Sequence, residues 1–415
     1  MRILMAAAAC SPYLVSEHSV GWVWLKAAAD HHDVHLLCAD YDLKDLHRAR
    51  EEGLLPPHVM VTPVGQPVWG YSKDRFTARL QTWKRAAQFQ TACAATMREV
   101  LARENFDIAH HTSIATWRLG SPLVDSGLPL VWGPLGGGER FPLRYLTVLT
   151  PKAKYLEIGR ILSNWKDRFR PLARKTARRT AVAISTNLDT DKMLLRLGTR
   201  CPVLRCPMLL EDSKFEKIVG LASARSRNPG LLRIFSGGTL EGRKGIHMSL
   251  VALTKLRDSG IPFHYTFGNH GPDGPAYARM SDELGLRDHV TFLPALKGEE
   301  YFEKLVQTDV FLLPSLRDNT SLTLIEAMAA GCLPIVLKAG GPGDAVTPEA
   351  GIALELSNPN RTAEEIYQAL REAWKNPSRA GELASAARER VRSTYLASRI
   401  PRILHEAYSL AAKSR

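Results

Sequence analysis

The sequence lacks any apolar run long enough to cross a membrane as a helix. Nowhere in its 415 residues do 18 consecutive apolar residues occur, and no low-complexity tract is present. The apolar run at residues 3–10 is eight residues long and follows one basic residue. This is short for a secretory signal and is better explained by a buried first strand. We therefore expect a globular, cytoplasmic protein without a membrane-spanning segment.

Cysteines are few and form no framework. There are six, at positions 10, 38, 93, 201, 206 and 332, and they lie scattered in apolar segments. Cys201 and Cys206 are the one close pair, and no His or Cys set of metal-ligand spacing accompanies them. We expect buried free thiols in a reducing compartment and no metal site.

Acidic residues are scarce between positions 140 and 180, although the whole chain carries a net charge of +13. Twelve Lys or Arg residues in this stretch face only Glu157 and Asp167, and Trp165 and Phe169 lie among them. Three interpretations remain open: an anionic membrane surface, a solvated basic face, or nucleic acid. The mixture of aromatic and basic residues favours the membrane surface. We expect no nucleic-acid partner, because no recognised binding motif accompanies the charge.

Apolar strand patterns alternate with helical patterns in two successive series. The first series has strands at 2–10, 34–38, 106–111, 128–132 and 181–186, with helices at 20–29 and 189–197. The second has strands at 232–236, 263–267, 290–293, 310–313 and 333–337, with a helix at 245–256. This alternation predicts an α/β protein with two Rossmann-like domains that face each other across a ligand cleft.

The domain boundaries follow from where the pattern restarts. We expect an N-terminal Rossmann-like domain at 1–206, a linker at 207–228 and a C-terminal Rossmann-like domain at 229–392. The helical stretch 380–413 can cap either half, and its last part, about 393–415, is a candidate to pack back on the N-terminal domain.

Two carboxylates follow the predicted strand at 310–313. Asp318 lies in the loop after the strand, and Glu326 lies eight residues later in a helix. Ligands of open α/β sheets bind at the carboxyl ends of strands, and free amides at a helix N-terminus favour phosphate. The amides in question belong to Asn319, Thr320, Ser321 and Leu322. The alternative is that Asp318 or Asn319 caps the helix and Glu326 is a solvated helix acid.

A glycine-rich turn follows the first strand of the second series. Gly238 lies in this turn, and Arg243 and Lys244 stand at the entry to the next helix. Backbone amides and a cation there suit a diphosphate. An exposed basic turn is the alternative.

These motifs together resemble those of the retaining, nucleotide-sugar-dependent glycosyltransferases of family 4, which have the two-domain GT-B fold. The resemblance rests on Asp318 and Glu326 with the sequence E-A-M-A-A-G at 326–331, on P-S-L-R-D at 314–318 and on G-G-P-G at 340–343. It implies that Glu326 binds the donor ribose, that Asp318 binds hydroxyls of the donor sugar and that Lys244 binds the diphosphate.

The resemblance continues in the N-terminal half, so that it spans residues 1 to about 360. Ser16, Glu17 and Gly21 match the first loop and helix, which border the donor phosphates and the acceptor. His110 matches a catalytic histidine near the donor sugar, and residues 132–139 match a glycine-rich loop.

The chain also departs from the family pattern. Asp318 stands where Glu is usual, and Asn319-Thr320-Ser321 replaces small, glycine-rich residues. Thr239 stands where many relatives have an arginine, for which Arg243 is a candidate substitute.

The function implied by the resemblance is transfer of a sugar, with retention, from a UDP- or GDP-sugar to a glycan or lipid-linked acceptor in cell-surface polysaccharide biosynthesis. No cofactor or catalytic metal is expected, and we interpret Asp189-Thr190-Asp191 as a helix cap rather than a metal triplet. The alternatives are a degenerate sugar-nucleotide-binding protein and a sugar-nucleotide epimerase. The basic stretch would place the protein peripherally at the inner membrane face.

Overall fold

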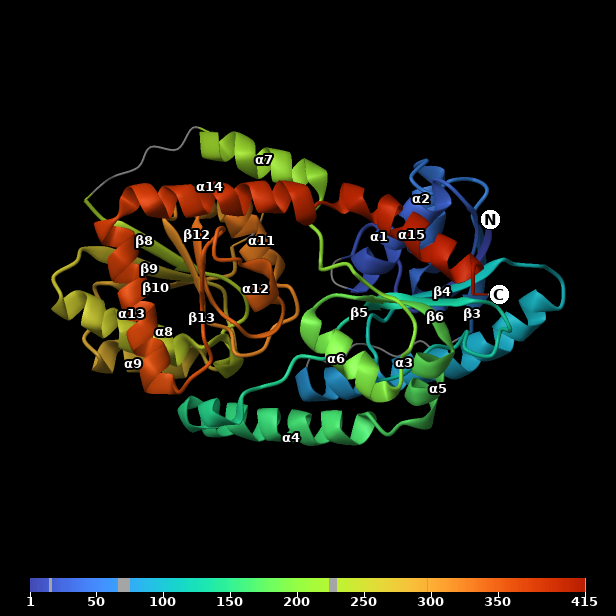
Figure 1. The fold of residues 1–415 in the computed structure, drawn as a ribbon, viewed down its shortest axis with the longest axis horizontal. Helices are drawn as coiled ribbons and strands as arrows, with labels where there is room; N and C mark the ends of the chain where they lie inside the picture. The colour runs from blue at the N-terminus through green and yellow to red at the C-terminus, as the bar shows by residue number, and fades with distance from the viewer. Residues whose placement is uncertain (15–16, 66–74, 224–229, 297, 415) are drawn as a thin grey trace.

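Two parallel sheets, each covered by helices on both faces, form the protein (Figure 1). The computed structural model describes residues 1–14, 17–65, 75–223, 230–296 and 298–414. In the described chain the first sheet has the strand order β3-β2-β1-β4-β5-β6-β7, and the second has the order β10-β9-β8-β11-β12-β13. The predicted α/β class with two Rossmann-like domains is confirmed.

The first sheet and its helices come from the N-terminal half. Its strands are β1 (Arg2–Ala7), β2 (Asp33–Ala39), β3 (Met60–Val64), β4 (Ile108–Ser113), β5 (Leu130–Leu135), β6 (Thr180–Ser185) and β7 (Val203–Arg205). Its helices are α1 (Glu17–Ala29), α2 (Leu43–Glu51), α3 (Arg75–Leu101), α4 (Pro151–Asp167), α5 (Pro171–Arg179) and α6 (Leu188–Leu197). The 3-10 turns are η1 (Asp40–Asp42) and η2 (Leu143–Val148).

The second sheet comes from the C-terminal half. Its strands are β8 (Leu232–Ser236), β9 (Phe263–Gly268), β10 (Val290–Leu293), β11 (Val310–Leu313), β12 (Leu333–Leu337) and β13 (Ile352–Leu354). Its helices are α7 (Asp212–Ser223), α8 (Ile246–Asp258), α9 (Gly274–Glu283), α10 (Gly298–Val306), α11 (Leu322–Ala329), α12 (Gly340–Ala345), α13 (Pro359–Lys375) and α14 (Pro377–Thr394). The turns η3 (Gly242–Lys244) and η4 (Ala397–Arg399) precede α8 and the last helix, α15 (Ile400–Ala412).

The central strands form from continuous apolar runs, because they are covered on both faces. All four residues of β11 and all five of β12 are buried. Their carboxyl ends meet at one edge of the sheet, since the pairing of Val310 with Leu333 sets the two strands in parallel register. That edge carries the loop with Asp318.

Helix α15 connects the C-terminal end of the chain to the N-terminal sheet. Figure 1 shows α14 over the second sheet and α15 continuing over the first. Ile400, Leu404 and Tyr408 of α15 are buried in the same cluster as Ile3 and Val182. The chain therefore ends on the domain in which it begins.

Two segments outside the predicted C-terminal domain also belong to its core. Helix α7 lies within the predicted linker 207–228, and its Phe215 and Ile218 are fully buried against α10 and α11. Phe141 and Tyr145, from the predicted N-terminal domain, are buried with β8 and α8 residues. The Tyr145 hydroxyl lies 2.8 Å from Thr362 Oγ1 on α13. In consequence α4, which follows this segment, runs beneath both domains (Figure 1).

None of the helices in the described parts of the chain is long and apolar enough to span a membrane.

Candidate active site

The loop between β11 and α11 reaches the domain boundary in a constrained conformation. Ser321, the N-cap of α11, has a φ of 56° and is the one non-glycine residue with positive φ in the described chain. No side chain caps this helix end. The alternative interpretation, with Asp318 or Asn319 as the cap, is therefore wrong. A left-handed serine is uncommon, and such strain is concentrated at functional sites.

Asp318 instead joins the two basic residues that follow β8. Lys244 Nζ donates a hydrogen bond to Asp318 Oδ2, and Arg243 Nη1 lies 3.3 Å from Asp318 Oδ1. The Lys244 side chain is 6% exposed, so the alternative of an exposed basic turn is excluded for this residue. Burial alone would raise the pKa of the Asp318 carboxyl, but the adjacent charges of Lys244 and Arg243 outweigh it and lower that pKa. The carboxylate is therefore ionised at neutral pH.

Glycines allow the surrounding turns to approach closely. A Cβ on Gly341 would lie 1.6 Å from the carbonyl oxygen of Asn319, and one on Gly340 would lie 2.3 Å from that of Asp318. Gly341 N–H donates a hydrogen bond of 3.1 Å to Asp318 O. Gly238 has a φ of 97°, and a Cβ there would lie 3.2 Å from Lys244 Nζ. Gly340 and Gly341 of the G-G-P-G motif thus pack directly against the backbone of the loop that carries Asp318.

Glu326 lines a cavity of about 560 Å³ between the domains. Burial raises the pKa of its carboxyl to about 7, against the opposing effects of Lys214 and Tyr301. The cavity is lined from the C-terminal side by Leu209, Leu210, Lys214, Leu322 and Glu326, and from the N-terminal side by Tyr13, Glu17, Val20 and Trp24. We call this cavity the glutamate chamber. A half-buried acid on an otherwise largely apolar wall suits recognition of a hydroxylated ligand.

Asp318 lines a second cavity of about 500 Å³, which we call the arginine chamber. The two chambers share Glu17, Ala115 and Asn319 as lining residues. Asn319 also joins the domains, because its Oδ1 accepts a 2.8 Å hydrogen bond from Asn187 Nδ2. Asn187 Nδ2 lies 2.7 Å from Glu139 Oε1 as well. The chambers therefore form two adjoining parts of one interdomain cleft, separated by the Asn319 loop.

The remaining predicted residues lie at different distances from this cleft. Glu17 lines both chambers, and its Oε2 accepts a hydrogen bond from Ala115 N–H at 2.9 Å. Thr320 Oγ1 accepts one from Met208 N–H at 3.2 Å, across the domain boundary. Gly21 lies behind the site, where a Cβ would be 2.0 Å from Ala9 O, so it allows α1 to pack on the end of β1. Ser16 lies outside the described residues.

His110 is placed differently from what the resemblance implies. Its side chain is fully buried; Nε2 donates to Gly133 O at 2.9 Å, and Nδ1 accepts from the Tyr408 hydroxyl at 2.7 Å. Burial lowers the pKa of its imidazole to about 4, so the ring is neutral. Trp24 and Tyr408 lie against it. Such a histidine holds β4, β5 and α15 together, and its geometry offers no surface for contact with a sugar.

The triplet Asp189-Thr190-Asp191 does not supply the cap of α6. The cap is Asn187, whose Oδ1 accepts a hydrogen bond from Thr190 N–H at 2.9 Å. Asp191 pairs with Arg205 instead. Among the described residues, no group of three or more His, Cys, Asp or Glu side chains is arranged to hold a metal ion.

Sequence reasoning missed the groups that the N-terminal half brings to the arginine chamber. Arg118, Glu139 and Arg160 line it together with Arg243 and Arg317. Arg317 is held by a bidentate pair with Glu157 of α4, at 2.7 and 3.1 Å. These residues lie in loops and on a helix surface far along the chain from Asp318, and no local motif indicated them.

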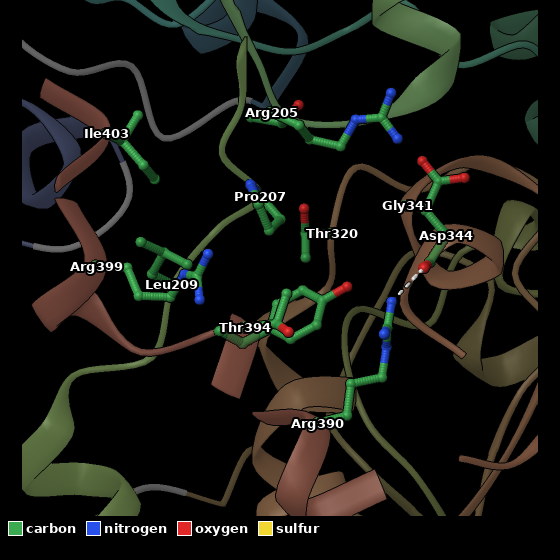
Figure 2. Close-up of a pocket in the computed structure, with 12 residues that line it drawn as sticks. Arg205, Pro207, Leu209, Thr320, Gly341, Asp344, Arg390, Thr394, Arg399 and Ile403 are labelled. Atoms are coloured by element: carbon green, nitrogen blue, oxygen red, sulfur yellow. Dashed lines mark hydrogen bonds between the residues drawn. The ribbon is translucent and has the colours of Figure 1, made fainter. Parts of the chain in front are cut away.

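A smaller cavity of about 180 Å³ lies at the junction between the domains (Figure 2). It is lined by Arg205, Thr320, Asp344, Arg390 and Arg399, among others. Figure 2 shows Arg390 directed at the backbone of Asp344, whose carbonyl oxygen lies 3.3 Å from Arg390 Nη2. Pro207 and Arg399, near which the chain passes from one domain to the other, line this cavity, and so does Thr320 of the loop before α11.

Two facing Rossmann-like domains with ligand-binding groups in the cleft define the GT-B class of fold. Solved structures support this assignment along the whole chain. Sucrose-phosphate synthase from Thermosynechococcus elongatus has a TM-score of 0.63 at 16% identity, covering 100% of both chains. HepE from Anabaena, solved in complex with UDP, has a TM-score of 0.62 at 16% identity, covering 99% of this chain and 100% of that one.

Residues 224–390 match the family described as "Glycosyl transferases group 1". The putative colanic acid biosynthesis glycosyltransferase WcaL of Escherichia coli is 32% identical over 112 residues. That match covers 25% of this chain and 27% of WcaL, so the chain spans about a quarter of the length of this curated relative.

Proposed function

We propose that the protein is a retaining glycosyltransferase of family 4, which moves a sugar from a UDP- or GDP-sugar to a glycan or lipid-linked acceptor. The observation that carries the proposal is the pairing of Asp318 with Lys244 and Arg243 beside a chamber lined by Glu326. A nucleotide-sugar requires cations for its diphosphate and carboxylates for its sugar and ribose hydroxyls. Both kinds of group meet here at neighbouring strand ends.

The donor occupies the cleft with its ribose at Glu326 and its sugar at Asp318. The diphosphate replaces Asp318 as the partner of Lys244 and Arg243, and it also accepts hydrogen bonds from backbone amides at the start of α11. Asp318 is then free to accept hydrogen bonds from sugar hydroxyls. The acceptor oxygen bonds to the anomeric carbon as the bond to the diphosphate breaks, and the acceptor proton passes to the departing diphosphate. The fixed cations stabilise the negative charge that develops there, without a metal.

The known proteins support the donor class and the biological setting. HepE was solved with UDP and with UDP-glucose, and the name of WcaL refers to colanic acid biosynthesis. We extend both to this chain as proposals, with a cytoplasmic site of action in cell-surface polysaccharide biosynthesis.

A screen of UDP-, GDP- and ADP-sugars for nucleotide release and sugar transfer tests the proposal. We expect saturable release with one donor in the wild type and a loss of about tenfold or more in Glu326→Ala, because hydrogen bonds to a charged group contribute about 1.5–3 kcal/mol. Glu283→Ala, which changes an exposed glutamate of α9, is the matched control and should retain wild-type rates.

The other outcomes separate the alternatives. Donor binding without release on any acceptor would identify a degenerate binding protein, and appearance of the epimeric sugar would identify an epimerase. Absence of binding to every sugar nucleotide would refute the proposal.

We also propose that helix α4 places the enzyme on an anionic membrane surface. Tyr155, Ile158, Leu162, Trp165 and Phe169 recur at helical spacing along α4 and its C-terminal extension, and their exposed fractions are 78%, 40%, 61%, 59% and 51%. An apolar stripe this exposed is unusual on a protein surface. Beside it, Arg174, Lys175, Arg178 and Arg179 line an open depression together with Phe169. Aromatic and apolar side chains next to basic ones suit the headgroup region of an anionic bilayer.

Co-sedimentation with vesicles of neutral or anionic lipid, at low and high salt, tests the membrane proposal. We expect binding to anionic vesicles that weakens with salt and falls several-fold in Leu162→Glu. Leu195→Glu, at an equally exposed leucine of α6 (64%), should bind like the wild type. Equal sedimentation of both variants would contradict the proposal, and a concentration-dependent dimer lost in Leu162→Glu would assign the stripe to a second copy instead.

A further inference from the structure

Four arginines line the arginine chamber, and the three besides Arg243 come from elements far apart in the sequence. Arg118 follows β4, Arg160 lies on α4, and Arg317 lies in the loop before Asp318. Arg118 is 5% exposed and donates through Nη2 to Asn164 Oδ1 on α4. The chamber thus brings together positive charge from both domains.

The carboxylates of the chamber are already engaged by other groups. Glu139 accepts from Gly137 N–H and Asn187 Nδ2, and Glu17 accepts from Ala115 N–H. Glu241 pairs with Arg243 Nε at 2.7 Å, and Asp318 pairs with Lys244. Arg317 has its own partner in Glu157.

Arg160 is left without an acidic partner. In the described parts of the chain, no carboxylate lies within ion-pair distance of its guanidinium, and its buried Nε has no hydrogen-bond acceptor. Burial, followed by repulsion from Arg317 and Arg118, lowers the pKa of this guanidinium to about 9. A buried donor without an acceptor is costly unless a ligand satisfies it.

The N-terminal side of the chamber relates to the acceptor rather than to the nucleotide. This step rests on the proposed function, in which Arg243 and Asp318 bind the donor and the N-terminal half binds the acceptor. Arg243 and Asp318 line the arginine chamber from the C-terminal half, whereas Arg118 and Arg160 line it from the N-terminal half. A donor whose sugar reaches Asp318 therefore shares this chamber with an acceptor that lies against Arg118 and Arg160.

We infer that the acceptor substrate is anionic, with a phosphate or carboxylate group bound by Arg118 and Arg160 in the arginine chamber. The planar guanidinium of Arg160 suits bidentate recognition of either group. The distance of this group from the reacting hydroxyl would then help select which hydroxyl is glycosylated.

Binding of three model sugars at constant ionic strength tests the inference. Glucose 6-phosphate carries a phosphate, methyl glucuronide a carboxylate, and methyl glucoside no charge, and each is titrated with and without saturating UDP or GDP. We expect at least one anionic sugar to bind in both conditions, about tenfold or more tightly than the neutral one. Which of the two binds distinguishes a phosphorylated acceptor from a uronic acid.

The matched variants are Arg160→Gln, Arg160→Lys and Lys166→Gln, the last at an exposed lysine of the same helix. We expect Arg160→Gln to lose the anion preference and Arg160→Lys to recover part of it, while Lys166→Gln and the nucleotide affinity of all three stay unchanged. Thermal melting of each variant shows whether it is folded.

Two results would overturn the inference. One is an anionic sugar that binds no better than the neutral sugar. The other is competition between the anionic sugar and the nucleotide together with weaker nucleotide binding by Arg160→Gln, which would assign these arginines to the donor diphosphate. Anion binding that depends on Arg160 in a protein that binds no nucleotide would instead refute the proposed function and leave the anion site standing.

Discussion

At the scale of single residues, the two acids of the site have opposite electrostatic environments. Asp318 lies against Lys244 and Arg243, whose charges overcome the effect of burial and lower its pKa. Burial raises the pKa of the Glu326 carboxyl to about 7, because the charge of Lys214 and the hydroxyl of Tyr301 only partly offset it. Perturbed acids of this kind are concentrated at functional sites. Burial of Glu326 thus disfavours its ionised form in the folded protein, as expected for a carboxylate that is not reserved for stabilising the fold.

This environment predicts the effect of Glu326→Gln on stability. The folded protein retains the Glu326 proton up to about pH 7, whereas the unfolded chain releases it near pH 4.3. Between these values the folded state binds more protons, so the ionisation of Glu326 lowers the free energy of unfolding as pH rises, and the loss is complete above pH 7. We expect Glu326→Gln to be more stable than the wild type by about 3–4 kcal/mol at pH 8 and nearly equal to it at pH 4.5.

Urea unfolding of both proteins at the two pH values measures this difference. A Glu326→Gln variant that is less stable than the wild type at pH 8 would show that the carboxylate has a stabilising partner and is not reserved for a ligand.

At the scale of elements, the site depends on a loop supported by glycine. The backbone of Asp318 and Asn319 rests on Gly340 and Gly341 at the start of α12, and Ser321 adopts a left-handed conformation. The conformation of this loop therefore depends on the glycines at the start of α12 as well as on the residues of the loop itself.

Gly341→Ala should displace this loop without removing any ligand contact. Its Cβ would meet backbone atoms of Asn319 at 1.6 and 2.5 Å, so the loop must shift. We expect destabilisation by about 1–3 kcal/mol, as for an overpacked core, and at least a tenfold loss of nucleotide affinity. Gly220→Ala in α7, where a Cβ meets nothing within 4 Å, is the control and should leave both unchanged or raise stability slightly. Wild-type nucleotide affinity in Gly341→Ala would show that the loop does not form the donor site.

At the scale of the whole molecule, both domains depend on segments from the other half of the chain. Tyr145 and Phe141 enter the C-terminal core, and Tyr408 enters the N-terminal core. Arg317 with Glu157, and Asn319 with Asn187, hold the domains together at the cleft. The loop that carries Asp318 therefore makes both of these contacts between the domains.

The sequence predicted the central strands well and three of the four edge strands of the described sheets poorly. Strands 232–236, 310–313 and 333–337 were predicted with the bounds that the structure shows, because buried strands are continuous apolar runs that end at polar residues or glycine. The edge strand β10, at 290–293, was also predicted with its observed bounds. Strands β3, β7 and β13 were missed, since edge strands are short or partly exposed and have little apolar pattern.

The candidate site shows the same division. Lys244 and Asp318 follow the neighbouring parallel strands β8 and β11. The family resemblance assigns them to adjacent parts of one donor, Lys244 to the diphosphate and Asp318 to the sugar hydroxyls, and does not predict their direct contact. Arg118, Arg160 and Glu157 could not be predicted, because only the packing of α4 across both domains brings them to the cleft.

The most direct test of the account compares a nucleoside diphosphate with its 2′-deoxy analogue in the wild type and in Glu326→Ala, using UDP or GDP, whichever binds. If Glu326 accepts hydrogen bonds from the ribose diol, loss of the 2′-hydroxyl should weaken binding about tenfold in the wild type and less than about twofold in Glu326→Ala. Equal losses in the two proteins, or no binding of either nucleotide to the wild type, would contradict the central claim that this cleft is a nucleotide-sugar site.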